Sequence, residues 1–374
     1  MKINLVLIPF IIILGLLMSS NDNKHNRGIY IVLCSMVLLF IAVLRSPEWF
    51  EYRYHIDTLT YKELFEANCD LGWKEFWNMV SQSRLGNGPE VDIGYFGLMA
   101  IMGRLTHSYY IFSFIADLVF FVPFGIILYC YSTCMRQLVF AFVFFISFLL
   151  MGFVGGGRQS IAMGFDLMAF LAVIDRKKWR AILFFLAGVT IHFSSLLFLI
   201  PLLMIWFNVK PKTLKIIHII CFALVPLVLI FPGQIVVFMG SLSGVERYAN
   251  YGVEVQGGAT TFIVLIELLS LFCLLSIKKN DMQNNPYIRI FYVMVPLFTI
   301  IAPLIIANGA MIRLSAYYHN FLVLLVPMAI DCMFKEKDRR IVYIIAILAL
   351  AYLTVSDGGT EYYFYWQYPG VLSM

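Results

Sequence analysis

Apolar runs follow one another along most of the chain, with short polar segments between them. A helix of about 20 apolar residues crosses a bilayer. We therefore predict spans near 4–18, 29–44, 109–131, 138–153, 161–174, 181–191, 193–207, 214–231, 262–277, 287–307, 311–334 and 341–355. The run 91–105 is shorter and contains Asp92 and Arg104, which is typical of a re-entrant or interfacial helix. The pattern predicts an all-α polytopic membrane protein with about 12 transmembrane helices and this additional helix.

The composition agrees with a membrane protein. Hydrophobic residues make up 61% of the chain and charged residues only 13%, whereas about a quarter of a soluble protein is charged. We see no soluble domain and expect a single integral membrane domain over residues 1–374. The seven cysteines show neither a metal-type spacing nor a disulfide framework, so we expect no metal site.

Clusters of basic residues predict the topology, because cytoplasmic loops are enriched in Lys and Arg. The segments 175–180 and 335–340 are the strongest such clusters and should be cytoplasmic. Keeping Lys210, Lys212 and Lys215 inside requires a break at 192–195, so that 181–207 forms two short helices in a broken-helix hairpin. Both termini then face outside, and residues 45–107 form a long outer segment.

Arg158 and Gln159 stand between two apolar runs, directly after Gly155, Gly156 and Gly157. An arginine at the edge of the bilayer is costly unless it pairs or faces a water-filled cavity. The glycines allow the backbone to approach another group closely, and a guanidinium suits bidentate contact with phosphate. The alternative is an interfacial arginine that reaches the lipid headgroups, and the sequence leaves both interpretations open.

The predicted outer segments are richer in arginine than in lysine, and their arginines are Arg45, Arg53, Arg84, Arg104, Arg158, Arg247 and Arg313. This excess is unexpected for a topology signal alone and indicates a bound anion such as phosphate or diphosphate. Scattered contacts with lipid headgroups are the alternative. The long outer segment also mixes carboxylates with aromatic residues, including Trp49, Tyr61 and Tyr95, which fits a sugar-binding surface or an ordinary amphipathic cap.

His192 lies at the predicted helix break. An imidazole there can act as a general base or contact a diphosphate, although a structural role is the simpler alternative. Interrupted helices at membrane depth usually line a cavity, which favours a functional role.

Several of these residues, taken in order, resemble the EpsG-like branch of the Wzy-type polysaccharide polymerases. The resemblance rests on Arg45, Asp57 with Tyr61, Glu90 to Tyr95, Arg158-Gln159, the basic loop 176–178, His192 with Ser194 and Ser195, and Arg313 with Tyr317. It covers residues 44–201 well and the last third weakly. Gly155–Gly157 before Arg158, and His55-Ile56 before Asp57, depart from the pattern.

The resemblance implies a GT-C-like inverting glycosyltransferase that polymerises lipid-linked repeat units. It would work in the bacterial cytoplasmic (inner) membrane, with the active site facing the periplasm or exterior. The growing glycan on undecaprenyl diphosphate would be transferred to the non-reducing end of a new lipid-linked repeat unit. The glycan could be O-antigen of lipopolysaccharide, capsule or exopolysaccharide. The alternatives are an O-antigen ligase and a polysaccharide flippase or transporter.

The implied reaction assigns roles to particular residues. We take Asp57 as the first candidate for the base, with Glu90 and His192 as rivals. We expect the diphosphate at Arg158, Arg313, Arg247 and Arg45, and the sugars at Tyr61, Trp49, Tyr95, Tyr317 and Gln159. We expect no cofactor, no metal and no nucleic acid. Membrane lipid, a chain-length regulator and a flippase of the same pathway are the expected partners besides the lipid-linked oligosaccharide.

Overall fold

The computed structural model of the chain describes residues 2–49, 57–84, 92–150, 153, 157–243, 250–356 and 361–367. Within these ranges the regular elements are helical, and the β-type pairing recorded consists of two isolated antiparallel bridges, Lys2 with Glu361 and Arg45 with Phe364. The chain divides into two compact units, Met1–Leu199 with Leu350–Met374, and Ile200–Ala349.

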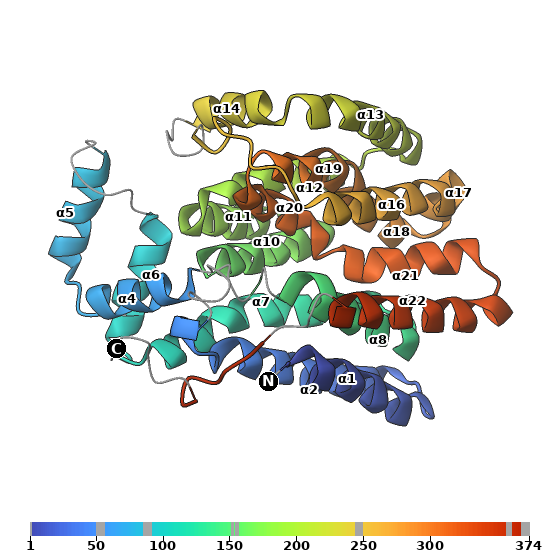
Figure 1. Ribbon diagram of the computed structural model, residues 1–374, viewed down its shortest axis with the longest axis horizontal. Helices are drawn as coiled ribbons and strands as arrows, with labels where there is room; N and C mark the ends of the chain where they lie inside the picture. Colours follow the sequence, from blue (N-terminus) through green and yellow to red (C-terminus); the bar gives the residue numbers. More distant parts are fainter. Residues whose placement is uncertain are drawn as a thin grey trace. The chain divides into compact units, whose positions relative to one another are not determined.

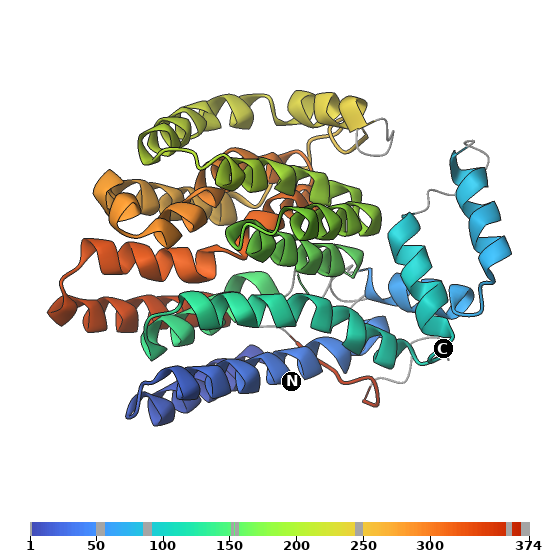
Figure 2. The same cartoon turned by 180° about the vertical axis from the view of Figure 1, so that it is seen from behind.

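The first unit contains most of the residues singled out in the sequence. Its elements are α1 (Asn4–Ser19), α2 (Lys24–Val43), α4 (Thr58–Asn68), α5 (Trp73–Arg84), α6 (Ile93–Gly103), α7 (Tyr109–Tyr131), α8 (Met135–Phe144), the π-helical η1 (Phe145–Leu149), α10 (Arg158–Ile174), α11 (Lys178–Ile191) and the 3-10 helix η2 (Phe193–Phe198). Helix α2 packs against α7, α7 packs against α10, and α10 packs against α11 (Figures 1 and 2). The start of α2 is fixed by Asn23, whose side chain accepts a hydrogen bond from the Asn26 amide, as N-cap residues do.

Helices α4, α5 and α6 lie together at one end of the first unit. They meet α7 through an aromatic cluster in which Phe65 stacks on Phe112 with ring centroids 4.5 Å apart. Helix α6 has 11 residues, too few to cross a bilayer as a helix. It is one of the shorter apolar helices of the described part, and its re-entrant or interfacial position stays a prediction.

The second unit begins within α12 (Leu199–Trp206) and ends within α22 (Glu336–Ser356). Between them lie α13 (Pro211–Ile230), α14 (Pro232–Ser243), α16 (Thr260–Ser276), α17 (Lys279–Asn284), α18 (Pro286–Tyr292), α19 (Met294–Ile301), the 3-10 helices η3 (Ala302–Ile306) and η4 (Gly309–Met311), α20 (Ile312–His319) and α21 (Leu322–Met333). Its interior holds a polar network, in which His218 lies 2.5 Å from the Tyr292 hydroxyl and 2.8 Å from the Ser270 hydroxyl. Side-chain hydrogen bonds of this kind join neighbouring helices in membrane proteins.

Several long apolar helices mark the chain as a membrane protein. By length and composition, four helices of the described part can cross a bilayer: Lys24–Val43, Tyr109–Tyr131, Pro211–Ile230 and Pro286–Ile306. The helices Gly309–His319 and Leu322–Met333 make a fifth if they form one span, but they are bent by 58° at the break between them. The larger number of about 12 spans, the GT-C architecture and the single membrane domain remain predictions.

The helix break expected near His192 is present. Helix α11 ends at Ile191, His192 has extended backbone angles (φ −154°, ψ 116°), and η2 begins at Phe193. The His192 amide still donates to the Gly188 carbonyl at 2.9 Å, so the imidazole side chain stands at the last turn of α11. The broken-helix hairpin over residues 181–207 remains a prediction.

Candidate functional site

The first turns of α4, α6 and α10 converge around the guanidinium of Arg158. Arg158 is the first residue of α10, and Tyr61 and Tyr95 lie in the first turns of α4 and α6. The Arg158 Cζ atom lies 5.8 Å from the Tyr61 ring centroid and 5.9 Å from that of Tyr95. Helix N-termini carry partial positive charge and exposed N–H groups, so a convergence of three of them with an arginine favours an anion.

Asp92 supplies the negative charge that pairs with Arg158. The Nη1 atom of Arg158 donates to the Asp92 carboxylate, and the two side chains are 21% and 19% exposed. The pair offsets the cost of holding a guanidinium at the edge of an apolar region. The Nε atom of Arg158 is buried and has no hydrogen-bond partner within the described ranges.

Gly157 explains part of the glycine run before Arg158. It has a φ of +34°, and a Cβ atom there would lie 2.2 Å from the Cε2 atom of Tyr61. The close approach expected from the glycines is therefore, at Gly157, an approach to the Tyr61 ring. Gly155 and Gly156 lie outside the described residues.

A small cavity of about 20 Å³ lies beside Gly157 and is lined by Arg45, Tyr61, Tyr95, Tyr109, Phe112, Ser113, Ala116, Asp117, Gly157 and Ile161. A volume of this size holds about one water molecule. Arg45 and Asp117 are 5% and 8% exposed, so a basic and an acidic side chain lie together in this lining. Arg45 donates from Nη1 to the Ala42 carbonyl, and the Ser113 hydroxyl lies 3.5 Å from the Asp117 carboxylate.

Tyr61 and Tyr95 are themselves buried, at 5% and 1% exposure, and their ring centroids are 6.0 Å apart in an edge-on arrangement. Burial raises the pKa of Tyr95 well above its ordinary value, so this phenol stays protonated. The two rings pack against protein and flank the Arg158 guanidinium.

The helix break at His192 lies near the first turns of α4, α6 and α10. A Cβ atom on Gly94 would lie 2.5 Å from the Thr190 hydroxyl oxygen and 2.8 Å from the Thr190 carbonyl carbon. The start of α6, which carries Asp92 and Tyr95, therefore packs against the last turn of α11. His192 follows this turn directly, so the structure brings its segment beside the Asp92 segment.

The buried side chain of Asp166 stabilises the segment that follows the helix break at His192. The Ser195 hydroxyl lies 2.8 Å from both carboxylate oxygens of Asp166 in α10. The two residues are 0% and 1% exposed. Gly188 permits this approach, because a Cβ atom there would lie 2.9 Å from the Ser195 hydroxyl oxygen. The hydrogen bond fixes η2 against α10, which begins with Arg158.

Other predicted site residues of the first unit lie around this center. The Asp57 carbonyl accepts from the Tyr61 amide at 3.0 Å, which places the two residues one turn apart on the same side of α4. Gln159 follows Arg158 in α10 and is buried. Trp49 packs on Tyr363 with ring centroids 4.5 Å apart and does not line the small cavity.

The remaining predicted residues fall elsewhere. Glu90 and Arg247 lie outside the described residues. Arg313 and Tyr317 lie in α20 of the second unit, where Tyr317 is 1% exposed. Their roles stay predictions.

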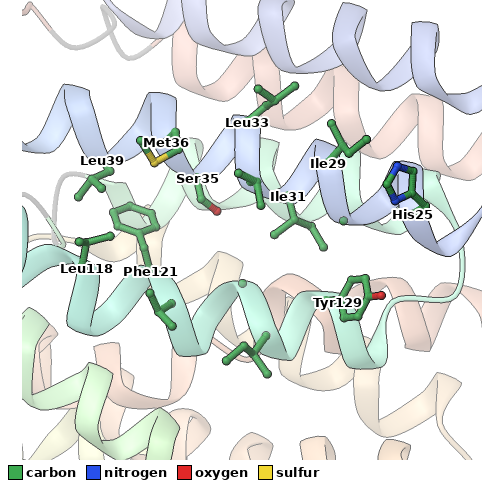
Figure 3. Close-up of a pocket in the computed structure, with 15 residues that line it drawn as sticks. His25, Ile29, Ile31, Leu33, Ser35, Met36, Leu39, Leu118, Phe121 and Tyr129 are labelled. Carbon is green, nitrogen blue, oxygen red and sulfur yellow. The ribbon is translucent and has the colours of Figure 1, made fainter.

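A second cavity of the first unit is a large apolar groove between α2 and α7. It has a volume of about 690 Å³, with His25 and Tyr129 at one end and Leu39, Leu118 and Phe121 at the other (Figure 3). None of the predicted site residues lines it. Its lining is mostly apolar, with His25, Ser35 and Tyr129 as its polar side chains.

Sequence reasoning gave no role to Asp117 or Asp166, and it counted Asp92 only among the carboxylates of a possible sugar-binding surface. A signal was available for two of them, because Asp117 and Asp166 lie inside apolar runs, where an ionisable residue usually marks a functional or paired site. Asp92 was noted in its segment, but its pairing with Arg158, 66 residues away, has no local signature.

The comparisons with known proteins identify the family of the chain. The sequence model of the EpsG family matches residues 48–368, which include the candidate residues apart from Arg45. No curated protein and no solved structure matches the chain.

Proposed function

Because the chain belongs to the EpsG family, we propose that it is a polysaccharide polymerase of the glycosyltransferase type. The family match over residues 48–368 is the observation that carries this proposal. The helices long enough to cross a bilayer support an enzyme that works on lipid-linked substrates. We place it in the bacterial cytoplasmic membrane, with its site on the outer face.

The proposed reaction joins two lipid-linked glycans. The donor is the growing glycan on undecaprenyl diphosphate, and the acceptor is the non-reducing end of one new lipid-linked repeat unit. A base takes the proton of the acceptor hydroxyl, and the oxygen attacks the anomeric carbon of the donor. The bond from that carbon to the diphosphate oxygen breaks, and the anomeric configuration is inverted. The products are the extended glycan on its new lipid and free undecaprenyl diphosphate.

Arg158 is the residue that we assign to the departing diphosphate. Negative charge develops on the leaving oxygen, and a fixed guanidinium stabilises it without needing a metal ion. The Asp92 carboxylate and the flanking rings of Tyr61 and Tyr95 hold the guanidinium in place, so little reorganisation is needed when the charge develops. Arg45, Arg247 and Arg313 remain proposed contacts to the same group.

Asp57 is the proposed base, with Glu90 and His192 as the rivals. It lies one helical turn from Tyr61, whose ring flanks Arg158, so its position is compatible with a role beside the leaving group. A carboxylate base must only come within hydrogen-bond reach of the acceptor hydroxyl. Trp49, Tyr61, Tyr95, Tyr317 and Gln159 remain the proposed sugar contacts.

The test is the glycan size distribution of a strain that lacks the gene, complemented with wild type or with Arg158→Ala. Wild type should restore a ladder of repeat numbers, whereas Arg158→Ala should leave a single repeat unit. Arg180→Ala is a matched control, because Arg180 is an exposed arginine in α11 of the same unit and is not one of the arginines of the predicted outer segments, and it should restore the ladder.

The alternatives give different results in the same experiment. If the deletion strain attaches no repeat at all, a ligase or a flippase accounts for the phenotype better than a polymerase. A ladder that is unchanged by the deletion would overturn the proposal.

A purified-enzyme assay separates the charge of Arg158 from its shape. Arg158→Lys keeps the positive charge but loses the planar fork that contacts two phosphate oxygens. We expect it to lose activity by about 100-fold or more, the scale on which single transition-state donors act. Near-normal turnover would remove Arg158 from the diphosphate role.

A further inference from the structure

Three side chains that bind transition metals come together where two connections of the first unit meet. Cys69 and Asp70 lie between α4 and α5, and His107 lies between α6 and α7. The Cys69 Sγ, one Asp70 carboxylate oxygen and one His107 ring nitrogen lie within 4.8 Å of one another. This group was found among the described residues, and it lies outside the Arg158 site.

We propose that Cys69, Asp70 and His107 bind one Zn²⁺ ion that clamps the α4–α5 connection to the α6–α7 connection. Thiolate, imidazole and carboxylate are the ligands that zinc takes in proteins, and three protein ligands with one water are a usual open set. The thiolate and imidazole disfavour Mg²⁺ and Ca²⁺, which prefer oxygen ligands.

The distances fit a shared ion. The His107 Nδ1 and Asp70 Oδ1 atoms are 3.6 Å apart. Tetrahedral bonds of about 2.0–2.1 Å from one ion place a nitrogen and an oxygen roughly 3.4 Å apart. Asp70 and His107 have side chains that are 85% and 70% exposed, so they can change rotamer to close the remaining gap to the sulfur.

The backbone at Cys69 packs closely against the end of α6. A Cβ atom on Gly103 would lie 1.7 Å from the Cys69 carbonyl oxygen, so the glycine at the end of α6 lets the two connections touch. The Cys69 thiol now donates to the Glu66 carbonyl at 3.4 Å. On binding, the thiol proton would pass to solvent and the thiolate would bond to zinc, with His107 neutral and Asp70 ionised.

The zinc would stabilise the packing of α4 against α6, and these two helices carry Tyr61 and Tyr95. The zinc ion takes no part in the proposed transfer reaction. The proposal of a zinc site therefore does not rest on the proposed function. Metal binding is therefore measured directly rather than through activity.

The experiment uses the full chain, purified in detergent, reduced and stripped of metal, with Co²⁺ as a spectroscopic probe and Zn²⁺ as its competitor. Wild type should develop a thiolate-to-cobalt absorption band that saturates at one equivalent and disappears when Zn²⁺ is added. Cys69→Ser should lack the band. His107→Ala should weaken Co²⁺ binding by at least about tenfold.

Two matched controls test whether binding is specific. Cys130→Ser removes an exposed thiol in α7, and His25→Ala removes an exposed imidazole in α2; both should keep the band and the affinity. Zinc should also raise the Tm of wild type and of these controls, but not that of Cys69→Ser. No band in wild type with excess Co²⁺, a band that persists in Cys69→Ser, or an equal rise in Tm for Cys69→Ser would each overturn the proposal.

Discussion

The contact between Gly157 and Tyr61 makes a prediction whose size can be worked from the structure. A Cβ atom at residue 157 would lie 2.2, 2.4 and 2.6 Å from the Cε2, Cδ2 and Cζ atoms of Tyr61, whereas carbon atoms in contact prefer about 3.5–4.0 Å. The ring is only 5% exposed and cannot move away freely. Gly157→Ala should therefore destabilise the protein through overpacking.

Two contributions add up in this variant. Overpacking of a well-packed interior costs about 1–3 kcal/mol. The φ of +34° at Gly157 strains a residue with a side chain and costs of order 1–3 kcal/mol more. We expect Gly157→Ala to lower the free energy of unfolding by about 2–6 kcal/mol in total.

The assay is reversible unfolding in mixed micelles, arranged as a double-mutant cycle with Tyr61→Ala. Truncating the ring removes the clash but leaves the backbone strain. The cost of Gly157→Ala should therefore fall by about 1–3 kcal/mol in the Tyr61→Ala background. Gly125→Ala in α7 is the matched control, because its nearest neighbouring atom would be 3.4 Å away, and it should not destabilise.

A change in the free energy of unfolding of less than about 0.5 kcal/mol for Gly157→Ala, the usual scale of neutral surface changes, would contradict this prediction. An equal cost of Gly157→Ala with and without the Tyr61 ring would contradict it as well.

Three further predictions follow from single contacts. Ser195→Ala leaves the buried Asp166 carboxyl without its hydroxyl donor and should cost about 1–3 kcal/mol of unfolding free energy; no loss would remove this bond as a brace. Burial acts to raise the pKa of Glu48, but hydrogen bonds from Lys62, its own backbone and a serine, with the Lys62 charge, lower it below its ordinary value of 4.5. A carboxyl whose pKa is lower in the folded than in the unfolded protein stabilises the fold at pH values above its unfolded pKa. The stability that Glu48 adds over Glu48→Gln should therefore be present at pH 6 and shrink as the pH falls below about 4.5. A difference in the free energy of unfolding that is constant with pH would contradict this. Asp57→Asn should lower turnover of purified enzyme by about 100-fold or more, and full turnover would exclude Asp57 as the base.

Much of the local structure could be predicted from the chain alone. The apolar runs predicted the long helices at Lys24–Val43 and Tyr109–Tyr131, and the distribution of lysines predicted the break at His192. The predicted helix 311–334 was only partly right, because the structure bends it by 58° between His319 and Leu322. Length, apolarity and charge are properties of neighbouring residues, so a one-dimensional pattern carries them.

The contacts within the candidate site could not be predicted from such patterns. The sequence indicated that Arg158 must pair or face a cavity, and that the glycines before it approach another group closely. Only the fold identified Asp92 as the ion-pair partner and Tyr61 as the group beside Gly157. The cost of a charge at the bilayer edge is local, whereas the partner that offsets it comes from a distant helix.

The sequence by itself thus determined that this is a helical membrane protein with an arginine that needs a partner at the start of one helix, and it pointed to the EpsG family. The tertiary structure decided which side chains meet: three helix starts around Arg158, the hydroxyl of Ser195 on Asp166, and the side chains of Cys69, Asp70 and His107. The physical reason is that hydrophobicity acts residue by residue along the chain, whereas these contacts depend on the close packing of segments that are far apart in sequence.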